Sequence, residues 1–253
     1  MHIVKTIPAL RRLLAPIRAA QKTIGFVPTM GALHDGHASL ISAAQQENDC
    51  CVVSIFVNPT QFNDTQDFSL YPRTLKRDSD LLRSLEADCL FIPDYQTLYP
   101  DQYRFRIQEH EECNDREGKA RPGHFEGVLT VVMKLLMATQ ATRAYFGEKD
   151  YQQYELIKKM CAAFFIDTSI ECCPTVREKN GLALSSRNLR LNDQGREKAG
   201  LIYHILSTAQ TVTMARSQLT QAGFDVDYVT EKNGRRFVAV FYQDIRLIDN
   251  CPI

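Results

Sequence analysis

The pattern of apolar and polar positions in the first part of the chain alternates between short β-branched runs and amphipathic segments. Residues 23–28 and 50–57 are apolar runs rich in β-branched side chains, and such runs are typical of buried strands. Between them, four positions are spaced i, i+3, i+4 and i+7: His37, Leu40, Ile41 and Ala44. This spacing predicts a helix from residue 36 to about residue 47. Strand, helix and strand predict a βαβ unit with parallel strands and a right-handed crossover.

The same alternation continues to about residue 173. We expect further helices at 75–87, 128–138 and 151–165, and further strands at 89–92, 141–146 and 168–173. Alternating elements of this kind predict an α/β fold with a Rossmann-like, doubly wound parallel sheet. Ligands of such sheets bind at the carboxyl ends of the strands. Three polar motifs follow predicted strands: 28–37 (PTMGALHDGH), 58–62 (NPTQF) and 147–150 (GEKD).

After Pro174 the pattern changes. Residues 193–221 are mostly helical in pattern, and 226–229 and 236–242 resemble strands joined by an Asn233–Gly234 turn. We therefore expect a Rossmann-like domain at 1–175 and a smaller C-terminal α+β domain at 176–253.

Composition and charge narrow the functional classes. The 253 residues include thirty basic and thirty acidic side chains, and this balance gives no support for a nucleic-acid or membrane-surface partner. The eight cysteines include no C-x-x-C pair, which indicates buried reduced thiols rather than disulfides or zinc ligands. Residues 1–20 are interrupted by arginines and a proline, and no apolar stretch of 18 residues follows. We therefore expect a cytoplasmic protein.

Two histidines carry the most specific chemistry. His34 and His37 flank Asp35–Gly36 where a predicted strand turns into a helix. Backbone N–H groups and the helix dipole form an anion site there, and Gly31 and Gly36 let phosphate approach the backbone. The imidazoles can donate hydrogen bonds to phosphate oxygens as pyrophosphate leaves. A metal pair or two surface histidines are the alternatives, but the strand, glycines and helix favour the phosphate site.

The remaining motifs each have a functional and a structural interpretation. Asn58 and Gln61 are uncharged amides that suit a substrate bearing hydroxyl and carboxylate groups, although Asn-Pro is also ordinary turn chemistry. Lys149 is a candidate catalytic cation. Asp150 can reach Mg²⁺ or a ribose, or can cap the next helix. Residues 185–188 (SSRN) form either a phosphate clamp or a helix cap.

Six segments, in this order and spacing, resemble the pantoate–β-alanine ligase family of the H-x-G-H nucleotidyltransferase superfamily. They are PTMGALHDGH, SIFVNPTQF, YPRTL, RPGHFEGV, FGEKDYQQ and GLALSSRN. The match runs from about residue 23 to about residue 191 and resumes at 246–250 (RLIDN). The resemblance implies ATP-dependent condensation of (R)-pantoate with β-alanine through a pantoyl adenylate, with AMP and pyrophosphate as the other products. It also implies Mg²⁺ and a homodimer.

The resemblance assigns roles to individual residues. His37 is the implied proton donor, and His34 and Lys149 stabilise the transferred charge. The implied ATP-binding residues are Met30, Gly31, Ala32, Leu33, His34, Asp35, Gly36, His37, Gly147, Glu148, Lys149, Asp150, Val176, Leu184, Ser185, Ser186 and Arg187. The resemblance implies that Gln61 and Gln153 hold pantoate, with Gln61 also near β-alanine, and we expect Asn58 beside them from its own motif. The expected metal ligands are Asp78 and Asp150.

The sequence departs from the family pattern in two places, and two other functions are alternatives. Arg77 stands where family members usually have an acidic residue. Residues 227–229 run almost directly into 235–237, so the C-terminal domain is expected to be a shortened lid that closes less tightly. One alternative is a nucleotidyltransferase of the same fold, such as a cytidylyltransferase acting on an alcohol phosphate. The other is a nucleotide-binding regulatory protein without activity.

Overall fold

The computed structural model describes all 253 residues, and the chain forms two compact units. Unit 1 contains residues 1–33, 37–147 and 152–173, and unit 2 contains residues 34–36, 148–151 and 174–253. Two short segments from the N-terminal part of the sequence therefore belong to unit 2. Both carry motifs that the sequence singles out.

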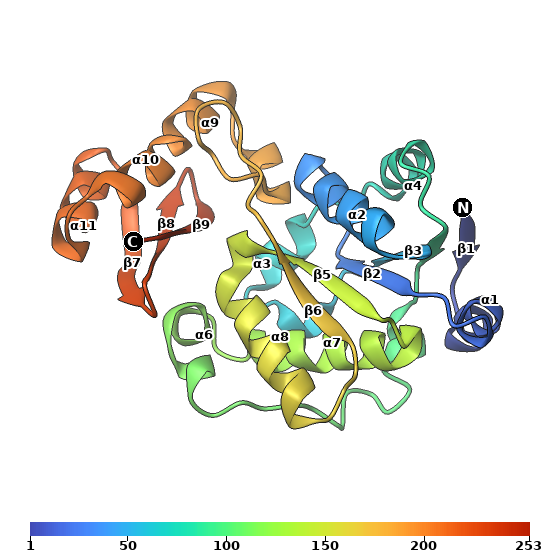
Figure 1. The fold of residues 1–253 in the computed structure, drawn as a ribbon. Helices are drawn as coiled ribbons and strands as arrows, with labels where there is room; N and C mark the ends of the chain where they lie inside the picture. The colour runs from blue at the N-terminus through green and yellow to red at the C-terminus, as the bar shows by residue number, and fades with distance from the viewer. The chain divides into compact units, whose positions relative to one another are not determined.

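A six-stranded parallel sheet forms the centre of unit 1, in the order β1-β4-β3-β2-β5-β6 (Figure 1). Its strands are β1 (His2–Val4), β2 (Ile24–Thr29), β3 (Cys50–Ile55), β4 (Cys89–Phe91), β5 (Arg143–Gly147) and β6 (Ser169–Cys173). The strand order reverses between β2 and β5, because the chain adds β3 on one side of β2 and later adds β5 on the other. Such a switch point is where doubly wound sheets bind ligands. The predicted doubly wound parallel sheet is confirmed.

Helices cover both faces of this sheet (Figure 1). They are α1 (Ile7–Ala19), α2 (Asp35–Glu47), α3 (Thr65–Leu70), α4 (Leu75–Ser84), α5 (Tyr95–Leu98), α6 (Arg116–Ala120), α7 (His124–Thr139) and α8 (Tyr151–Ala163). Successive strand residues point to opposite faces, and each face has its own core. Phe26 packs in the core that α1, α7 and α8 share, whereas Val27 packs in the core that α2 and α4 share.

The sequence pattern predicts no element before residue 23, yet β1 and α1 lie there. Leu10 and Leu14 of α1 are fully buried, and Ile7 and Ile17 pack against the same core. This i, i+3, i+4 face is narrow, and the arginines and Pro16 between its positions conceal it. Thr6 caps the helix by accepting a hydrogen bond from the Ala9 N–H group.

Unit 2 has its own core around a three-stranded antiparallel sheet, β7-β8-β9. The strands are β7 (Asp225–Lys232), β8 (Arg235–Tyr242) and β9 (Ile245–Pro252), and the helices are α9 (Asp193–Ala199), α10 (Leu201–Thr208) and α11 (Val212–Gln221). The expected α+β character is confirmed. Strand β9 was not predicted, because its buried positions include the polar residues Asp249 and Asn250.

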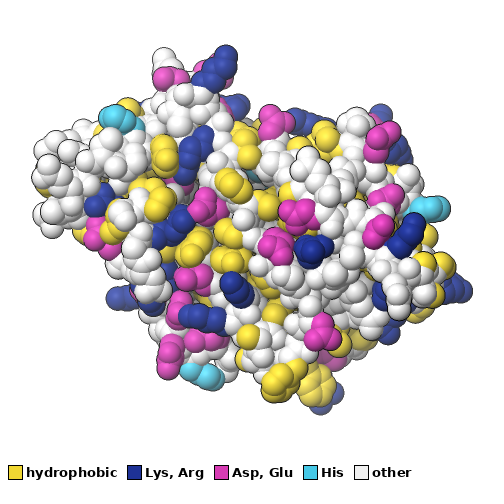
Figure 2. All heavy atoms as spheres, viewed as in Figure 1, with side chains coloured by type: hydrophobic (Ala, Val, Ile, Leu, Met, Phe, Trp, Pro, Cys, Tyr) yellow, Lys and Arg dark blue, Asp and Glu magenta, His cyan; other side chains and the backbone are white.

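The distribution of surface charge and the state of the cysteines can be compared with the expectations from composition. On the face drawn in Figure 2, basic and acidic side chains are interspersed. No helix is both long enough and apolar enough to cross a membrane. All eight cysteines are free thiols. Burial, with some help from nearby Asp88, raises the pKa of Cys51 to about 12, and such a thiol is unreactive at neutral pH.

Candidate active site

The turn after β2 is held by a buried carboxylate, Asp78 of α4. Its two oxygens accept hydrogen bonds from the N–H groups of Ala32 and Leu33, each at 2.9 Å, and Asp78 is 1% exposed. The Thr74 hydroxyl donates a third hydrogen bond at 3.0 Å. Ala32 has a left-handed backbone with φ of 50°, so the carboxylate stabilises an uncommon conformation. With both oxygens engaged and buried, Asp78 does not fit the predicted role of metal ligand; it shapes the turn instead.

His34 begins the part of the H-x-G-H turn that belongs to unit 2. Burial is the main cause that lowers its pKa to about 4, and the positive charge of Lys149 acts in the same direction. Asp35 and Asp150 oppose the shift. The Gly36 N–H group donates to His34 Nδ1 at 3.2 Å, so the neutral ring carries its proton on Nε2. His34 is therefore a neutral hydrogen-bond donor at pH 7.

Gly36 makes room for this imidazole. A Cβ atom on Gly36 would lie 2.9 Å from His34 Cε1 and 3.0 Å from His34 Nδ1. From the sequence, Gly36 is expected to let phosphate approach the backbone. The structure gives another reason, since any larger residue would displace the ring of His34.

The second turn of unit 2 follows β5 and forms the 3₁₀ helix η3 (Glu148–Asp150). Lys149 Nζ lies 3.7 Å from Asp150 Oδ2, and the two side chains are 16% and 46% exposed. The mostly buried ammonium group of Lys149 can neutralise phosphate charge. The half-exposed carboxylate of Asp150 stays accessible to a ligand. No group of three or more His, Cys, Asp or Glu side chains is arranged to hold a metal ion.

Residues 176–184 form a small hairpin in unit 2. The Leu184 N–H group donates to the Val176 carbonyl at 3.0 Å, which places two predicted ATP-site residues opposite each other. The next residue, Ser185, caps the 3₁₀ helix η4 (Ser186–Arg190), accepting a hydrogen bond from the Arg187 N–H group at 3.2 Å. The helix-cap interpretation of this serine is therefore confirmed. The cap also fixes the backbone that carries Ser186 and Arg187.

In unit 1, the amide of Gln61 lies in the 3₁₀ helix η1 (Pro59–Gln61) and is supported by Asn58. Asn58 is 1% exposed. Its Nδ2 donates to Gln61 Oε1 at 3.1 Å and to the Gly127 carbonyl at 3.2 Å, and its Oδ1 accepts from the Tyr99 hydroxyl at 3.0 Å. Asn58 was expected to face the substrate. Its amide is instead occupied within the protein, and it orients Gln61.

The first turn of α7 also holds η1, and the sequence analysis missed this role. His124 Nδ1 donates to the Gln61 carbonyl at 2.8 Å, while its Nε2 accepts from Arg121 Nη1 at 3.1 Å. A Cβ atom on Gly127 would lie only 2.4 Å from the Thr60 carbonyl oxygen, so only glycine lets α7 approach this closely. The sequence carried one signal of this contact, since His124 and Gly127 are spaced i, i+3 and share a helix face.

The structure also distinguishes the two adjacent glutamines of α8. Gln152 is 4% exposed; its Oε1 accepts from the Glu117 N–H group at 3.1 Å, and its Nε2 donates to the Glu112 carbonyl at 2.8 Å. Gln153 is only half-buried. Gln152 therefore has a structural role, and the substrate contact of Gln153 stays a prediction.

The predicted residues thus fall into two groups, one in each unit. Unit 2 holds His34, Asp35, Gly36, Glu148, Lys149, Asp150, Val176, Leu184, Ser185, Ser186 and Arg187. Unit 1 holds Met30, Gly31, Ala32, Leu33, His37, Asn58, Gln61, Asp78, Gly147 and Gln153. Within unit 1, Gln61 Nε2 lies 3.2 Å from Met30 Sδ, so the NPTQF motif contacts the turn after β2.

Comparison with known proteins gives one consistent result. The model of a family described as pantoate-β-alanine ligase matches residues 2–252. Pantothenate synthetase from Bdellovibrio bacteriovorus is 50% identical over 93% of this chain and 94% of its own. Pantothenate synthetase from Legionella pneumophila (strain Corby) is 50% identical over 90% of each chain.

Solved structures agree with the sequence relatives. The crystal structure of pantoate-β-alanine ligase from Francisella tularensis, complexed with β-γ ATP and β-alanine, is 45% identical with a TM-score of 0.94. It covers 100% of this chain and 97% of its own. The pantothenate synthetase of Thermus thermophilus is 38% identical with a TM-score of 0.92, over 100% of this chain and 99% of its own. These two relatives are almost the same length as this chain.

Proposed function

This chain belongs to the pantoate–β-alanine ligase family, and we propose that different residues of its predicted site bind ATP and pantoate. The enzyme is an ATP-dependent, AMP-forming ligase that condenses (R)-pantoate with β-alanine to form pantothenate and pyrophosphate. The residues of unit 2 bind ATP in this proposal, together with Met30 to Leu33, His37 and Gly147. Gln61 and Gln153 bind pantoate, and Gln61 also contacts β-alanine.

In the first step, a carboxylate oxygen of pantoate bonds to the α-phosphorus of ATP. The bond from that phosphorus to the oxygen bridging to the β-phosphate breaks, and pyrophosphate leaves with the electron pair. Negative charge grows on the phosphoryl oxygens, so positioned donors lower the barrier. Neutral His34 donates a hydrogen bond through Nε2, Lys149 supplies positive charge, and His37 protonates the departing pyrophosphate.

In the second step, the amine of β-alanine attacks the carbonyl carbon of pantoyl adenylate. The bond from that carbon to the phosphate oxygen breaks, AMP leaves with the electron pair, and the nitrogen loses a proton. No side chain has to act as nucleophile in either step. The protein contributes positioning, charge neutralisation and exclusion of water.

One carboxylate among the proposed ATP-site residues also fits a magnesium ion. Mg²⁺ is usually held by one or two carboxylates together with substrate phosphates, rather than by a complete protein cage. Asp150 is the half-exposed carboxylate beside Lys149, and we propose that it contributes to holding Mg²⁺ on the ATP phosphates. The ion would supply further charge neutralisation.

Three further features follow the family and are proposed with it. The enzyme works in the cytoplasm, it forms a homodimer, and the segment after residue 175 closes over the nucleotide as a lid. Sedimentation velocity tests the homodimer directly, because a single monomeric species at micromolar concentration would contradict it.

The neutral His34 donor with Lys149 nearby is the observation that carries the assignment of the ATP group. Pyrophosphate release is the matching assay, performed with ATP and pantoate, with and without β-alanine. We expect release to require pantoate, and pantothenate to form only when β-alanine is added. Release that needs an alcohol phosphate and CTP instead would favour the cytidylyltransferase alternative. ATP binding without any release would favour the regulatory protein.

A further inference from the structure

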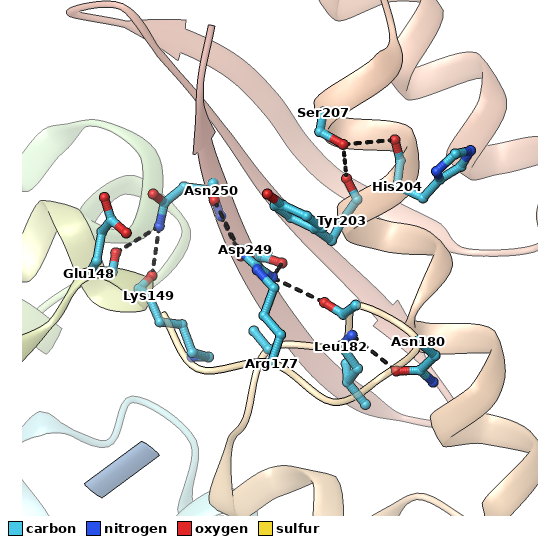
Figure 3. Close-up of polar contacts among 12 residues, drawn as sticks. Glu148, Lys149, Arg177, Asn180, Leu182, Tyr203, His204, Ser207, Asp249 and Asn250 are labelled. Carbon is cyan, nitrogen blue, oxygen red and sulfur yellow. Dashed lines mark hydrogen bonds and ion pairs between the residues drawn. The ribbon is translucent and has the colours of Figure 1, made fainter. Parts of the chain in front are cut away.

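A buried polar pair in β9, Asp249 and Asn250, contacts two segments that carry proposed ATP-site residues (Figure 3). Both side chains are almost completely buried, at 5% and 3% exposed. Asn250 Nδ2 donates to the backbone carbonyls of Glu148 at 3.0 Å and Lys149 at 2.9 Å. One amide group therefore holds two consecutive peptide units of the η3 turn.

Arg235 of β8 completes this connection. It donates a hydrogen bond to Asn250 Oδ1, and its Nη2 donates to Glu148 Oε1 at 2.6 Å. Its guanidinium group also lies 4.2 Å from the centre of the Tyr151 ring. The η3 turn is thus attached to the sheet of unit 2 through both its backbone and its side chains.

Asp249 performs the equivalent task for the 176–184 hairpin. Its Oδ1 accepts from Arg177 Nη2 at 2.9 Å, and Arg177 Nη1 also donates to the Gly181 carbonyl at 3.1 Å (Figure 3). The Arg177 guanidinium lies 3.5 Å from the centre of the Tyr203 ring. Arg177 directly follows the proposed ATP-site residue Val176. Two neighbouring residues of β9 therefore fix two segments of the proposed ATP site: Asn250 fixes the η3 turn, and Asp249 fixes the 176–184 hairpin.

We infer that Asn250 is a positioning residue for the adenylation step and that it acts through Lys149. The inference rests on the proposed role of Lys149. Holding the Glu148 and Lys149 carbonyls fixes the backbone from which the Lys149 side chain extends, and Nζ must meet phosphoryl oxygens at hydrogen-bond distance. A misplacement of about 1 Å can cost on the order of a hundredfold in rate. Asn250 touches no reacting atom in this proposal.

The test variant is Asn250→Asp, which keeps the size and the acceptor facing Arg235 but replaces the donor with an oxygen facing two carbonyls. We expect kcat for pantoate-dependent pyrophosphate release to fall by about 10- to 100-fold, while the KM for β-alanine stays within about twofold. Hydrogen exchange of the backbone around residues 147–151 should become faster. An unchanged kcat would overturn the inference.

Asn48→Asp is the matched control. Asn48 lies in unit 1, its Nδ2 donates to the Ala44 carbonyl at 2.9 Å, and its Oδ1 accepts from Arg143 Nη1 at 3.3 Å. The same substitution therefore replaces a donor to a backbone carbonyl beside an arginine, at a residue with no hydrogen bond to any proposed ATP-site residue. We expect its kcat to stay within about twofold of the wild-type value; an equal loss in both variants would show a general effect of the substitution and would overturn the inference.

A double-mutant cycle separates positioning from a merely structural effect. If Asn250 acts through Lys149, then Asn250→Asp should lower the rate by less than about threefold in the Lys149→Ala background. The same factor in both backgrounds would refute positioning while leaving the role of Lys149 intact. A Lys149→Ala enzyme with wild-type rate would refute the proposed role of Lys149 and this inference together. If Asn250→Asp fails to fold in a thermal melt, Arg235→Lys loosens the same connection and is judged by the same cycle.

Discussion

At the scale of single residues, the surroundings of His34 set its protonation. Burial first, and Lys149 second, lower its pKa to about 4 from the ordinary value of 6.5. The unfolded chain therefore binds more protons than the folded chain between these values, so the stability present above pH 6.5 is progressively lost as pH falls towards 4. We predict that His34 titrates near pH 4 in an NMR experiment, and that Lys149→Met raises this pKa. Titration of wild-type His34 near 6.5 would contradict the charge state used in the mechanism.

Asp78 and Asp150 differ in what their carboxylates contact, and we predict opposite effects of the same substitution. Asp78→Asn places an amide against backbone N–H groups that now share one buried oxygen. It should lower the free energy of unfolding by about 1–3 kcal/mol and leave the Mg²⁺ concentration for half-maximal rate unchanged. Asp150→Asn should leave unfolding unchanged and raise that concentration. Chemical denaturation and a Mg²⁺ titration of both variants provide the measurements, and a raised Mg²⁺ requirement in Asp78→Asn would restore the metal-ligand hypothesis.

At the scale of elements, the contact between α7 and η1 depends on Gly127. A methyl group there must displace the Thr60 and Gln61 backbone, which lies closer than any real Cβ contact allows. We predict that Gly127→Ala lowers the free energy of unfolding by about 1–3 kcal/mol, as overpacked sites do. The displaced Gln61 should also bind pantoate more weakly. A loss of about 1.4 kcal/mol in binding raises the KM for pantoate by about tenfold. Denaturation and steady-state kinetics measure the two effects.

Gly147→Ala is the contrasting substitution at the end of β5. A Cβ atom on Gly147 meets nothing within 4 Å, so the fold should be unaffected. We place Gly147 in the ATP site, and a methyl group there should raise the KM for ATP without changing that for pantoate. If both glycine variants affect the same substrate, the assignment of separate residues to ATP and to pantoate is wrong.

The elements also show how far sequence patterns reach. Strong periodicity predicted β2 to β6 and the longer helices between them, α2, α4, α7 and α8, because their apolar faces are continuous. The short helices α3, α5 and α6 were not predicted. The faces of α1 and β9 are interrupted by charged and polar side chains, and those side chains are tolerated for reasons that only the fold reveals. Asp249 and Asn250 are buried because distant backbone groups and Arg177 satisfy them.

The same limit applies to the site. Residue types and strand ends were enough to indicate His34, Lys149 and Gln61. They could not distinguish a contact residue from its support, because an amide such as Asn58 or a carboxylate such as Asp78 can do either. Only the hydrogen-bond partners in the fold decide, and for both of these residues they lie within the protein.

At the scale of the whole molecule, the C-terminal segment is not short in comparison with two solved relatives, which this chain covers to 97% and 99% of their lengths. We therefore predict that it protects the adenylate from water. With ATP and pantoate alone, pyrophosphate should appear as a burst of about one equivalent per active site, followed by slow release. The reason is that pantoyl adenylate stays bound and protected from water until β-alanine is added. Quenched-flow measurement of pyrophosphate tests this. Continuous multiple turnover without β-alanine would instead show the leak expected of a trimmed lid.

The division of the chain into units has a practical consequence for building chimaeras from related enzymes. Unit 2 is discontinuous in sequence, since residues 34–36 and 148–151 belong to it with the C-terminal segment. A recombination joint placed at residue 173 would take Asn250 and Arg235 from one parent. The η3 turn, which these two residues bind, would come from the other parent. A functional exchange must carry three separate segments, and the linear order of the gene is a poor guide to which residues have to be inherited together.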